Sequence, residues 1–286
     1  MLVLIHAMTD EDQDIQLFIG TLKQAAGYDF TDYSMKSLKR RLAKVLLDNS
    51  MDLYALIVEI KKSLTFAERV VRDITVNTTE LFRDPAIWQH LKYTVLPQIA
   101  DQENINIWHA GCSTGQEVYS MLILLNELGL LEKAKVYGSD LNSDVLDIAR
   151  KGSYKYRFNI GYLDNFDKVI KENPYNFEKY NDVPYEKYFI IDKANDALKL
   201  KPFLTEKPIF KKHDLVKEHN IFHVKFDIIL CRNVIIYFNY NLQNRVFDVF
   251  HQSLFDNGFL VLGMHETILG YHTANYEKKD QVYIRK

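Results

Sequence analysis

Residues 105–117 read INIWHAGCSTGQE, and this stretch decides the fold. Its first part, up to Ala110, is mostly apolar and has the length and residue types of a buried strand. A tight turn of small residues runs from Gly111 to Gly115. Apolar residues then recur at the spacing of one helix face, namely Val118, Met121, Leu122 and Leu125. Strand, glycine turn and helix in this order begin the nucleotide-binding half of an open, doubly wound α/β sheet.

A second short strand, residues 135–139, ends in Asp140. An acidic residue at that distance from a glycine turn is placed to accept hydrogen bonds from the two hydroxyls of a ribose. The same turn has a simpler interpretation, in which Gly111 and Gly115 only let the strand and the helix pack closely. The position of Asp140 favours the cofactor site over simple packing.

The turn also indicates the kind of cofactor. A dinucleotide places its pyrophosphate at the helix N-terminus, which must then be free of negative charge. Glu117 stands in the first turn of the predicted helix, where it would repel a diphosphate and suit a cation such as the ammonium or sulfonium of S-adenosylmethionine. The glycine spacing also departs from Gly-x-Gly-x-x-Gly, so we expect S-adenosylmethionine and not NAD. Alternatively, Glu117 only stabilises the helix N-terminus, which contributes about 0.3–1 kcal/mol.

The composition excludes several classes of protein. The 286 residues suffice for one large and one small domain, and 47% apolar with 26% charged residues is typical of a folded chain. A formal net charge of −2 gives no overall attraction to nucleic acid or membranes. No segment reaches the ~20 apolar residues that span a bilayer, and residues 1–8 lack the flanks of a signal peptide. Cys112 and Cys231 each follow a predicted strand, which fits a reducing cytoplasm and not a metal cluster.

Residues 1–74 are expected to form a separate helical domain. Apolar residues at helical spacing predict a first helix around Phe18 and further helices over 34–47, 53–60 and 66–74. Basic residues repeat along the second of these helices and form what we call the basic stripe: Lys36, Lys39, Arg40, Arg41 and Lys44. The stripe is either a solvated helix face or a docking surface for an acidic partner.

Residues 75–85 join the two expected domains, and their sequence differs from the featureless polar sequence expected of a linker. It places Asn77, Thr79 and Arg83 just ahead of the predicted sheet. Asn and Thr are also helix-capping residues, so a simpler interpretation is a cap for the next helix, which is predicted over 87–96 and closed by Pro97.

The rest of the chain returns to the sheet after an interruption. A helix is predicted over 143–150, and residues 153–206 have weak periodicity and are expected to be an insertion with a small antiparallel piece. Strands are predicted over 209–213 and 226–230, a helix over 242–254, a turn at 256–258, a strand over 259–263 and a final antiparallel strand near the C-terminus. Polar residues follow two of these strands, where open sheets bind ligands: Asp214-Leu215 and Arg232-Asn233.

Five motifs carry a resemblance to a known family. They read NTTELFRD, WHAGCSTGQEVYS, GSDLNSDVLDIAR, CRNVIIYF and DNGFLVLG, in this order. Over residues 25–286 the chain resembles the chemotaxis receptor methyltransferases, the CheR family. The resemblance implies an all-helical domain over 1–74 and a Rossmann-like S-adenosylmethionine methyltransferase domain over 75–286. It also implies a small β-subdomain inserted at about 153–206.

The resemblance also implies a set of site residues. Residues of the cofactor pocket would be Asn77, Thr79, Arg83, Gly111, Glu117, the ribose carboxylate Asp140, Asp214, Leu215 and, on the adenine side, Arg232 and Asn233. Tyr237 would lie near the transferred methyl group, so Arg83 and Tyr237 are the residues expected to orient substrate and methyl donor. Two departures from the family pattern are Gln116 with Val118 in the turn, and Asp214 in place of an asparagine.

The reaction implied by the resemblance is the methylation of chemoreceptor glutamates to γ-glutamyl methyl esters, with S-adenosylhomocysteine as product. A glutamate of pKa ~4.3 is ionised at neutral pH, so the protein need not remove a proton. The expected partner is the cytoplasmic domain of membrane chemoreceptors, docked by the basic stripe. We expect no metal, no nucleic acid, no membrane insertion, a monomer and a cytoplasmic location. Alternatives are a non-catalytic S-adenosylmethionine-binding module, or a related methyltransferase with another protein substrate.

Overall fold

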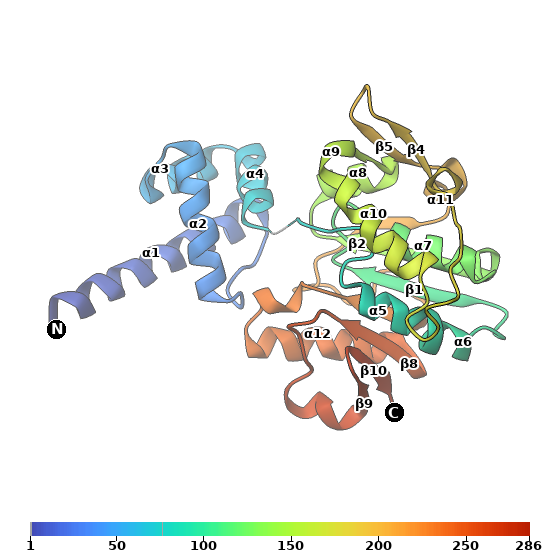
Figure 1. The fold of residues 1–286 in the computed structure, drawn as a ribbon. Helices are drawn as coiled ribbons and strands as arrows, with labels where there is room; N and C mark the ends of the chain where they lie inside the picture. The colour runs from blue at the N-terminus through green and yellow to red at the C-terminus, as the bar shows by residue number, and fades with distance from the viewer. Residues whose placement is uncertain (1, 76) are drawn as a thin grey trace. The chain divides into compact units, whose positions relative to one another are not determined.

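The strand predicted at the start of the deciding stretch is β1 (Ile105–Ala110), an interior strand of a seven-stranded sheet (Figure 1). The computed structural model describes residues 2–75 and 77–286, and side chains from residue 12 onward. The chain divides into two compact units. A helical unit comprises Met1–Val76 and Ile236–Gln243, and an α/β unit comprises Asn77–Ile235 and Asn244–Lys286.

The helical unit contains four helices that share one apolar core. They are α1 (Leu2–Ala26), α2 (Met35–Asn49), α3 (Leu53–Lys62) and α4 (Leu64–Ile74). The apolar side chains that predicted them are buried, among them Phe18, Leu22, Leu38, Leu42, Leu56, Ile60 and Val70. Capping residues set two of the helix starts, since Asp52 accepts the Ala55 N–H at 2.7 Å and Ser63 accepts the Phe66 N–H at 3.2 Å.

A segment from late in the chain completes the helical unit. The carbonyl of Tyr237 accepts the Ser34 N–H at 2.8 Å, and the Asn239 N–H donates to the Asp32 carbonyl at 2.8 Å. The rings of Tyr33 and Phe238 pack edge to face with centroids 5.1 Å apart. The short helix η6 (Ile235–Tyr237) and the start of α12 (Tyr240–Ser253) therefore include residues of this unit.

The sheet of the α/β unit has the order β6-β2-β1-β7-β8-β10-β9. Five neighbouring strands are parallel, β6 (Ile209–Lys212), β2 (Ala134–Asp140), β1, β7 (Phe226–Cys231) and β8 (Leu254–Leu262). The antiparallel strands are β10 (Val282–Arg285) beside β8, and β9 (Tyr276–Lys279) at the edge. The chain proceeds from β1 through β2 to β6 on one side and returns to β7 on the other. A switch of this kind leaves a crevice at the carboxyl ends of the strands.

The sheet is covered on both faces because successive side chains of a strand point to opposite sides. On one face Trp108 packs against Phe226 and against Phe250 of α12, with ring centroids 5.3 and 5.5 Å away. Ile105 and Ile107 point to the other face, where they share a core with apolar residues of α7 (Gln116–Glu127). The doubly wound fold expected from the sequence is confirmed.

Further elements surround the sheet. Ahead of β1 a continuous helix comprises α5 (Pro85–His90), the π-helical η1 (Leu91–Val95) and α6 (Leu96–Gln98). The others between the strands are η2 (Leu131–Lys133), α8 (Ser143–Lys151) and η7 (Gly270–Asn275). No helix among the described residues is both long and apolar enough to cross a membrane.

The expected insertion contains the predicted antiparallel piece. Its sheet has the order β3-β5-β4, from β3 (Ser153–Lys155), β5 (Ala197–Leu200) and β4 (Phe189–Asp192). Short helices fill the rest of it: α9 (Tyr156–Asn159), η3 (Ile160–Tyr162), α10 (Leu163–Phe166), η4 (Asp167–Lys171), η5 (Tyr185–Lys187) and α11 (Pro202–Thr205).

Two local predictions were wrong. The helix expected to stop before Pro97 continues to Gln98, because Pro97 begins a new turn after the π-helical η1, where its missing N–H costs little. The turn expected at 256–258 lies inside β8 as an irregularity, with Asn257 at φ +63°. The final antiparallel strand is confirmed as β10, which pairs with β8 and forms a hairpin with β9.

Candidate active site

The glycine turn after β1 requires glycine at two positions. Gly111 has φ +77°, and a Cβ there would lie 2.4 Å from Cγ2 of Val234. Gly115 has φ +88° and precedes α7, and a Cβ there would lie 2.8 Å from the Cβ of Ala149. Both glycines therefore serve backbone conformation and close packing, so they do not by themselves distinguish a cofactor site from a plain turn.

Asp140 connects the turn to the end of β2. Its Oδ2 accepts the Ser113 N–H at 2.8 Å and its Oδ1 accepts the Asn142 N–H at 2.9 Å. Burial raises the pKa of Asp140, and these backbone hydrogen bonds offset part of that increase. Each carboxylate oxygen can accept a second hydrogen bond, so Asp140 keeps the capacity to bind both hydroxyls of a ribose.

Glu117 already has two protein partners in the first turn of α7. Its Oε1 lies 2.9 Å from Nδ1 of His109, and its Oε2 lies 3.0 Å from Nη1 of Arg232. Burial alone would raise the pKa of Glu117, but the hydrogen bond from His109 and the charge of Arg232 outweigh it and lower the pKa. Glu117 is therefore ionised, and two protein partners fix its orientation. The sequence suggested only that this carboxylate would suit a cationic ligand.

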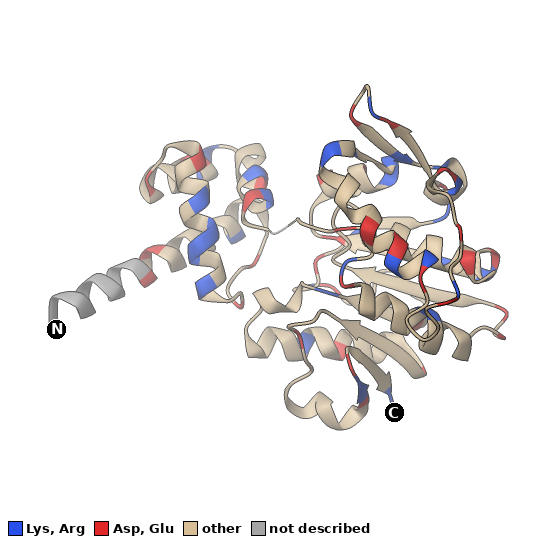
Figure 2. Cartoon of the chain, in the orientation of Figure 1, with Lys and Arg blue, Asp and Glu red and all other residues tan. Residues whose placement is uncertain are grey.

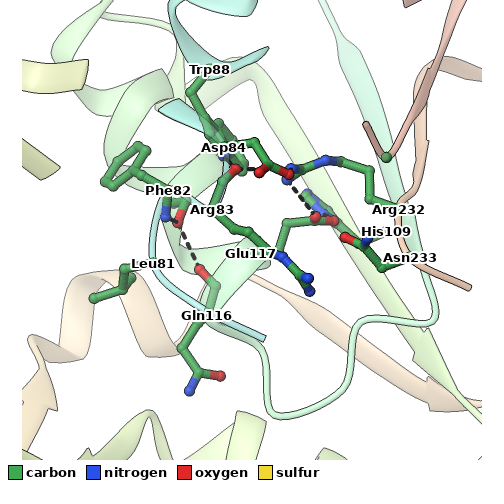
Figure 3. A network of polar contacts seen from close by, with 12 residues as sticks. Leu81, Phe82, Arg83, Asp84, Trp88, His109, Gln116, Glu117, Arg232 and Asn233 are labelled. Carbon is green, nitrogen blue, oxygen red and sulfur yellow. Dashed lines mark hydrogen bonds and ion pairs between the residues drawn. The ribbon is translucent and has the colours of Figure 1, made fainter. Parts of the chain in front are cut away.

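Arg232 is the centre of this network, which Figure 3 shows. Its side chain is 1% exposed, and besides Glu117 it binds Oδ2 of Asp84 at 2.7 Å and the carbonyl of Arg83 at 2.8 Å. The indole Nε1 of Trp88 donates to the same carbonyl at 3.0 Å. The guanidinium of Arg232 therefore ties the turn before α5 to the start of α7.

This anchoring fixes the backbone of Arg83 and leaves its side chain to extend away. In Figure 3 the hydrogen bonds of Arg83 end on its carbonyl, and no drawn contact ends on its guanidinium. The neighbouring Phe82 is fixed as well, because its N–H donates to Oγ of Ser120 at 2.8 Å. The network thus holds the turn rigid, and the guanidinium of Arg83 extends from this fixed backbone.

Glu266 fixes the segment after β7. Its Oε2 accepts the N–H groups of Asn233 at 2.7 Å and Gly263 at 2.8 Å, and its Oε1 accepts the Val234 N–H at 2.9 Å. Asn233 is in the left-handed region with φ +60°, a conformation that such hydrogen bonds can stabilise. The Arg232-Asn233 pair therefore follows β7 in a fixed geometry.

Asp214 and Leu215 follow β6 at the same edge of the sheet. The preceding N–H, of His213, donates to the Asp140 carbonyl at 2.9 Å, and Oδ1 of Asp214 accepts the Val216 N–H at 2.9 Å. Burial raises the pKa of Asp214, although the hydrogen bond from Val216 opposes it. The structure thus brings Asp214 beside the strand end that carries Asp140.

The remaining expected site residues are placed differently. Asn77 and Thr79 lie in an irregular segment, 77–80, that leads into the anchored turn, and they do not cap a helix, because α5 begins only at Pro85. Tyr237 belongs to the helical unit, whereas the other expected site residues belong to the α/β unit.

Sequence reasoning missed three residues of the network. Asp84 ends the NTTELFRD motif but was given no role, and His109 is a single polar residue in an apolar strand, a signal that could have been followed. Glu266 belongs to no recognisable motif. Among the side chains described, those of residues 12–75 and 77–286, no group of three or more His, Cys, Asp or Glu could hold a metal ion.

Comparisons with known proteins show which family the sequence is similar to. Residues 77–284 match the family model described as "CheR methyltransferase, SAM binding domain". The chain is 34% identical over 265 residues to the putative methyltransferase Cher3 of Pseudomonas putida, covering 91% of this chain and 92% of that protein. It is 31% identical over 217 residues to the chemotaxis protein methyltransferase of Borreliella burgdorferi, covering 72% and 70%.

Among solved structures, the α/β fold resembles a TehB-like SAM-dependent methyltransferase from Corynebacterium glutamicum. The TM-score is 0.37 at 12% identity, covering 70% of this chain and 92% of that chain.

Proposed function

Because the chain belongs to the CheR methyltransferase family, we propose that it methylates glutamate side chains in the cytoplasmic domain of membrane chemoreceptors and forms glutamyl methyl esters. The protein is a methyltransferase, and S-adenosylmethionine is its cofactor. The receptor substrate, the cytoplasmic location and a monomeric state are parts of the proposal. The receptor substrate rests on relatives that are named chemotaxis protein methyltransferases.

The residues of the α/β unit fit this cofactor. Asp140 has acceptor capacity left for ribose hydroxyls, and it ends β2 beside the carboxyl end of β1. Glu117 is held ionised close to the turn and supplies negative charge for the ammonium group. We propose that Arg83 binds the carboxylate of the cofactor or that of the substrate. We also propose that Asn77, Thr79, Leu215 and Asn233 line the pocket.

When bound, S-adenosylmethionine supplies an electrophilic methyl group on its sulfonium. The acceptor must therefore present a nucleophilic atom, and an amine or a hydroxyl would have to lose a proton, whereas a glutamate is already ionised at neutral pH. The observation that carries the proposal is the condition of the candidate bases at this sheet edge. Four of them, two histidines and two cysteines, are not available to a substrate.

Each of these four groups is buried. The side chain of His109 is 0% exposed and bonded to Glu117. His213 is 2% exposed, and its Nε2 lies 2.9 Å from the His219 carbonyl. Burial raises the pKa of both thiols, those of Cys112 and Cys231, well above the ordinary value. A site with these groups favours an acceptor that arrives ionised, and Arg83 can align its negative charge.

The helical unit offers a surface for an acidic receptor region. Basic residues recur along α2 (Figure 2). The side chains of Lys36, Arg40 and Lys44 are exposed, whereas Lys39 is half-buried and lies 2.8 Å from Asp12. We therefore assign docking chiefly to the three exposed members of the basic stripe.

Transfer of a tritiated methyl group to membranes that contain chemoreceptors tests the function. Brief treatment with alkali should release the label as volatile methanol, because esters hydrolyse where N-methyl groups and methyl ethers do not. Arg83→Ala should reduce the release without unfolding the protein. Label that survives alkali would place the methyl group on nitrogen or an ether oxygen and contradict the proposal.

A further inference from the structure

Lys92 is a buried lysine outside the network around Arg232. It lies in η1, is 6% exposed, and its Nζ donates to the carbonyls of Val169 at 2.7 Å and Ile170 at 3.2 Å. Both carbonyls belong to η4 of the insertion. A buried lysine costs free energy that an apolar side chain of similar volume would not, and burial accordingly lowers the pKa of Lys92. Packing alone therefore does not account for this lysine.

A second side chain joins the same two elements. Nε2 of Gln89 in α5 donates to the carbonyl of Lys168 at 2.9 Å. Gln89 and Lys92 are three residues apart on one continuous helix, so they share a face of it. Their acceptors are consecutive carbonyls in the last turn of η4, and the last carbonyls of a helix have no partner within it. The two side chains therefore cap η4 and fasten the helix of α5 and η1 to the insertion.

The other end of that helix follows Arg83. The carbonyl of Arg83 accepts the indole N–H of Trp88, in α5, at 3.0 Å (Figure 3). Trp88 precedes Gln89, so the bond that holds the backbone of Arg83 and the bonds that hold the insertion come from one short helix. The insertion also contacts the turn directly, because the rings of Phe82 and Phe166 pack edge to face with centroids 6.0 Å apart.

We propose that Lys92, together with Gln89, is a positioning residue for Arg83, and that through α5 the insertion fixes where the guanidinium of Arg83 lies. The inference rests on the proposed function for the role of Arg83 alone. Arg232 anchors the turn on one side, and Lys92 supplies a second support through the helix that follows. Small misplacements of a group that orients a reacting carboxylate cost much of the rate. The insertion then contributes to methyl transfer, although none of the expected site residues lies in it.

Trp88 reports on the turn without any ligand. The chain has two tryptophans, so Trp108→Phe leaves Trp88 as the only indole. Trp88 is buried in the folded protein. In this background Lys92→Met keeps most of the side-chain length but removes the donor. The emission of folded Lys92→Met protein should move to longer wavelength, because the indole is no longer held in a fixed apolar environment. A lysine that only adds stability would leave the spectrum of the folded protein unchanged.

A double-mutant cycle tests whether Lys92 acts through Arg83. Methyl transfer to membranes that contain chemoreceptors should slow by about tenfold in Lys92→Met, measured well below its unfolding temperature. In an Arg83→Ala background the same substitution should change the remaining rate by less than about twofold, because the group that Lys92 positions is gone. A lysine that acted on the whole fold would lower both rates by the same factor.

Lys225→Met is the matched control in the same unit. Nζ of Lys225 also donates to two backbone carbonyls, those of Gln252 at 2.5 Å and Leu254 at 3.3 Å. Lys225 precedes β7, so it lies at the amino ends of the strands, whereas the site lies at their carboxyl ends. This variant should leave both the emission of Trp88 and the rate of methyl transfer unchanged.

Gln89→Leu keeps the inference testable if Lys92→Met does not fold. It removes the more exposed of the hydrogen bonds to η4, and it should change both readouts in the same direction by less. Unchanged emission of Trp88 in the folded variants, or equal losses of rate with and without Arg83, would overturn the role of Lys92. A wild type that transfers no methyl group, or an Arg83→Ala variant as fast as the wild type, would instead contradict the proposed function.

Discussion

At the scale of single residues, carboxylates accept the hydrogen bonds that fix much of this site. Glu266 accepts hydrogen bonds from three backbone N–H groups, and one of its partners, Asn233, lies 33 positions away in the chain. Glu117 and Asp84 hold Arg232 in the same way. Such partners come together only after the sheet has formed, so sequence reasoning could identify the motif that contains Asp84 but neither its pairing with Arg232 nor Glu266.

Asp140 gives the prediction that belongs to this scale. We expect S-adenosylmethionine and S-adenosylhomocysteine to bind at about micromolar level, near −8 kcal/mol, and NAD not to bind. Asp140→Ala removes the acceptor for the ribose and the anchors of Ser113 and Asn142, so affinity should fall by about 10- to 100-fold, from losing hydrogen bonds to a charged group. Calorimetry measures both effects.

The control for this substitution lies on the next helix. Asp147→Ala removes an exposed carboxylate that pairs with Arg150, and it should leave the affinity unchanged. Equal binding by the Asp140→Ala variant, or measurable binding of NAD, would remove the basis for placing the ribose here.

At the scale of elements, the strand, turn and helix that decide the fold were predictable because their signal is local. Apolar length, glycine positions and helical spacing all occur within residues 105–125, and β1 and α7 form there. Errors arose where tertiary structure overrides a local rule. The helix runs through Pro97, and residues 256–258 form an irregularity in β8 where a free turn was expected.

The glycine turn supplies a prediction about stability. Gly115→Ala places a Cβ 2.8 Å from Ala149 at φ +88°, so it should destabilise the protein by about 1–3 kcal/mol. Gly20→Ala is the matched change, because Gly20 lies inside α1 with nothing within 4 Å, and alanine should stabilise that helix by about 0.5–1 kcal/mol. Urea unfolding followed by circular dichroism measures both. Effects of the same sign would contradict the role of the turn.

Helix α2 supplies the prediction about docking. Reversing the exposed charges of Lys36, Arg40 and Lys44 to Glu should weaken methylation of intact receptor and leave the affinity for S-adenosylhomocysteine unchanged. The difference from wild type should shrink as salt rises, since exposed charges are screened beyond about 8–10 Å at 0.1–0.15 M. Lys61→Glu with Lys62→Glu on α3 is the control in the same unit. Unaltered receptor methylation by the α2 variant would return the stripe to a solvated helix face.

At the scale of the whole molecule, the chain divides differently from a single cut in the sequence. The N-terminal helices were expected to end at residue 74, and the helical unit runs to Val76 and also takes in Ile236–Gln243. The pairing of Asn239 with Asp32 spans 207 positions, so no local pattern could reveal it. Tyr237, which we propose to act near the transferred methyl group, is therefore carried by a segment that the N-terminal helices help to hold.

This division predicts that N-terminal residues affect turnover. Asp32→Ala removes the acceptor of Nδ2 of Asn239 at 3.1 Å, and Phe238→Ala removes the ring that packs on Tyr33. Each loosens the segment around Tyr237, so methyl transfer should slow by about tenfold, because small misplacements of catalytic groups are costly. The affinity for S-adenosylhomocysteine should stay unchanged, since Asp140 and Glu117 belong to the other unit. Tyr237→Phe should give the same pattern directly.

Loss of stability alone must be distinguished from loss of position, and Asp52 allows it. Asp52→Ala removes the N-cap of α3 in the same unit, where it accepts the Ala55 N–H at 2.7 Å, and should lower stability by about 1 kcal/mol. Since Asp52 does not contact Ile236–Gln243 through that bond, methyl transfer should continue at the wild-type rate below the unfolding temperature. If Asp52→Ala slows transfer as much as Asp32→Ala does, the helical unit acts only through its stability. If neither slows it, the segment around Tyr237 is positioned without the N-terminal helices.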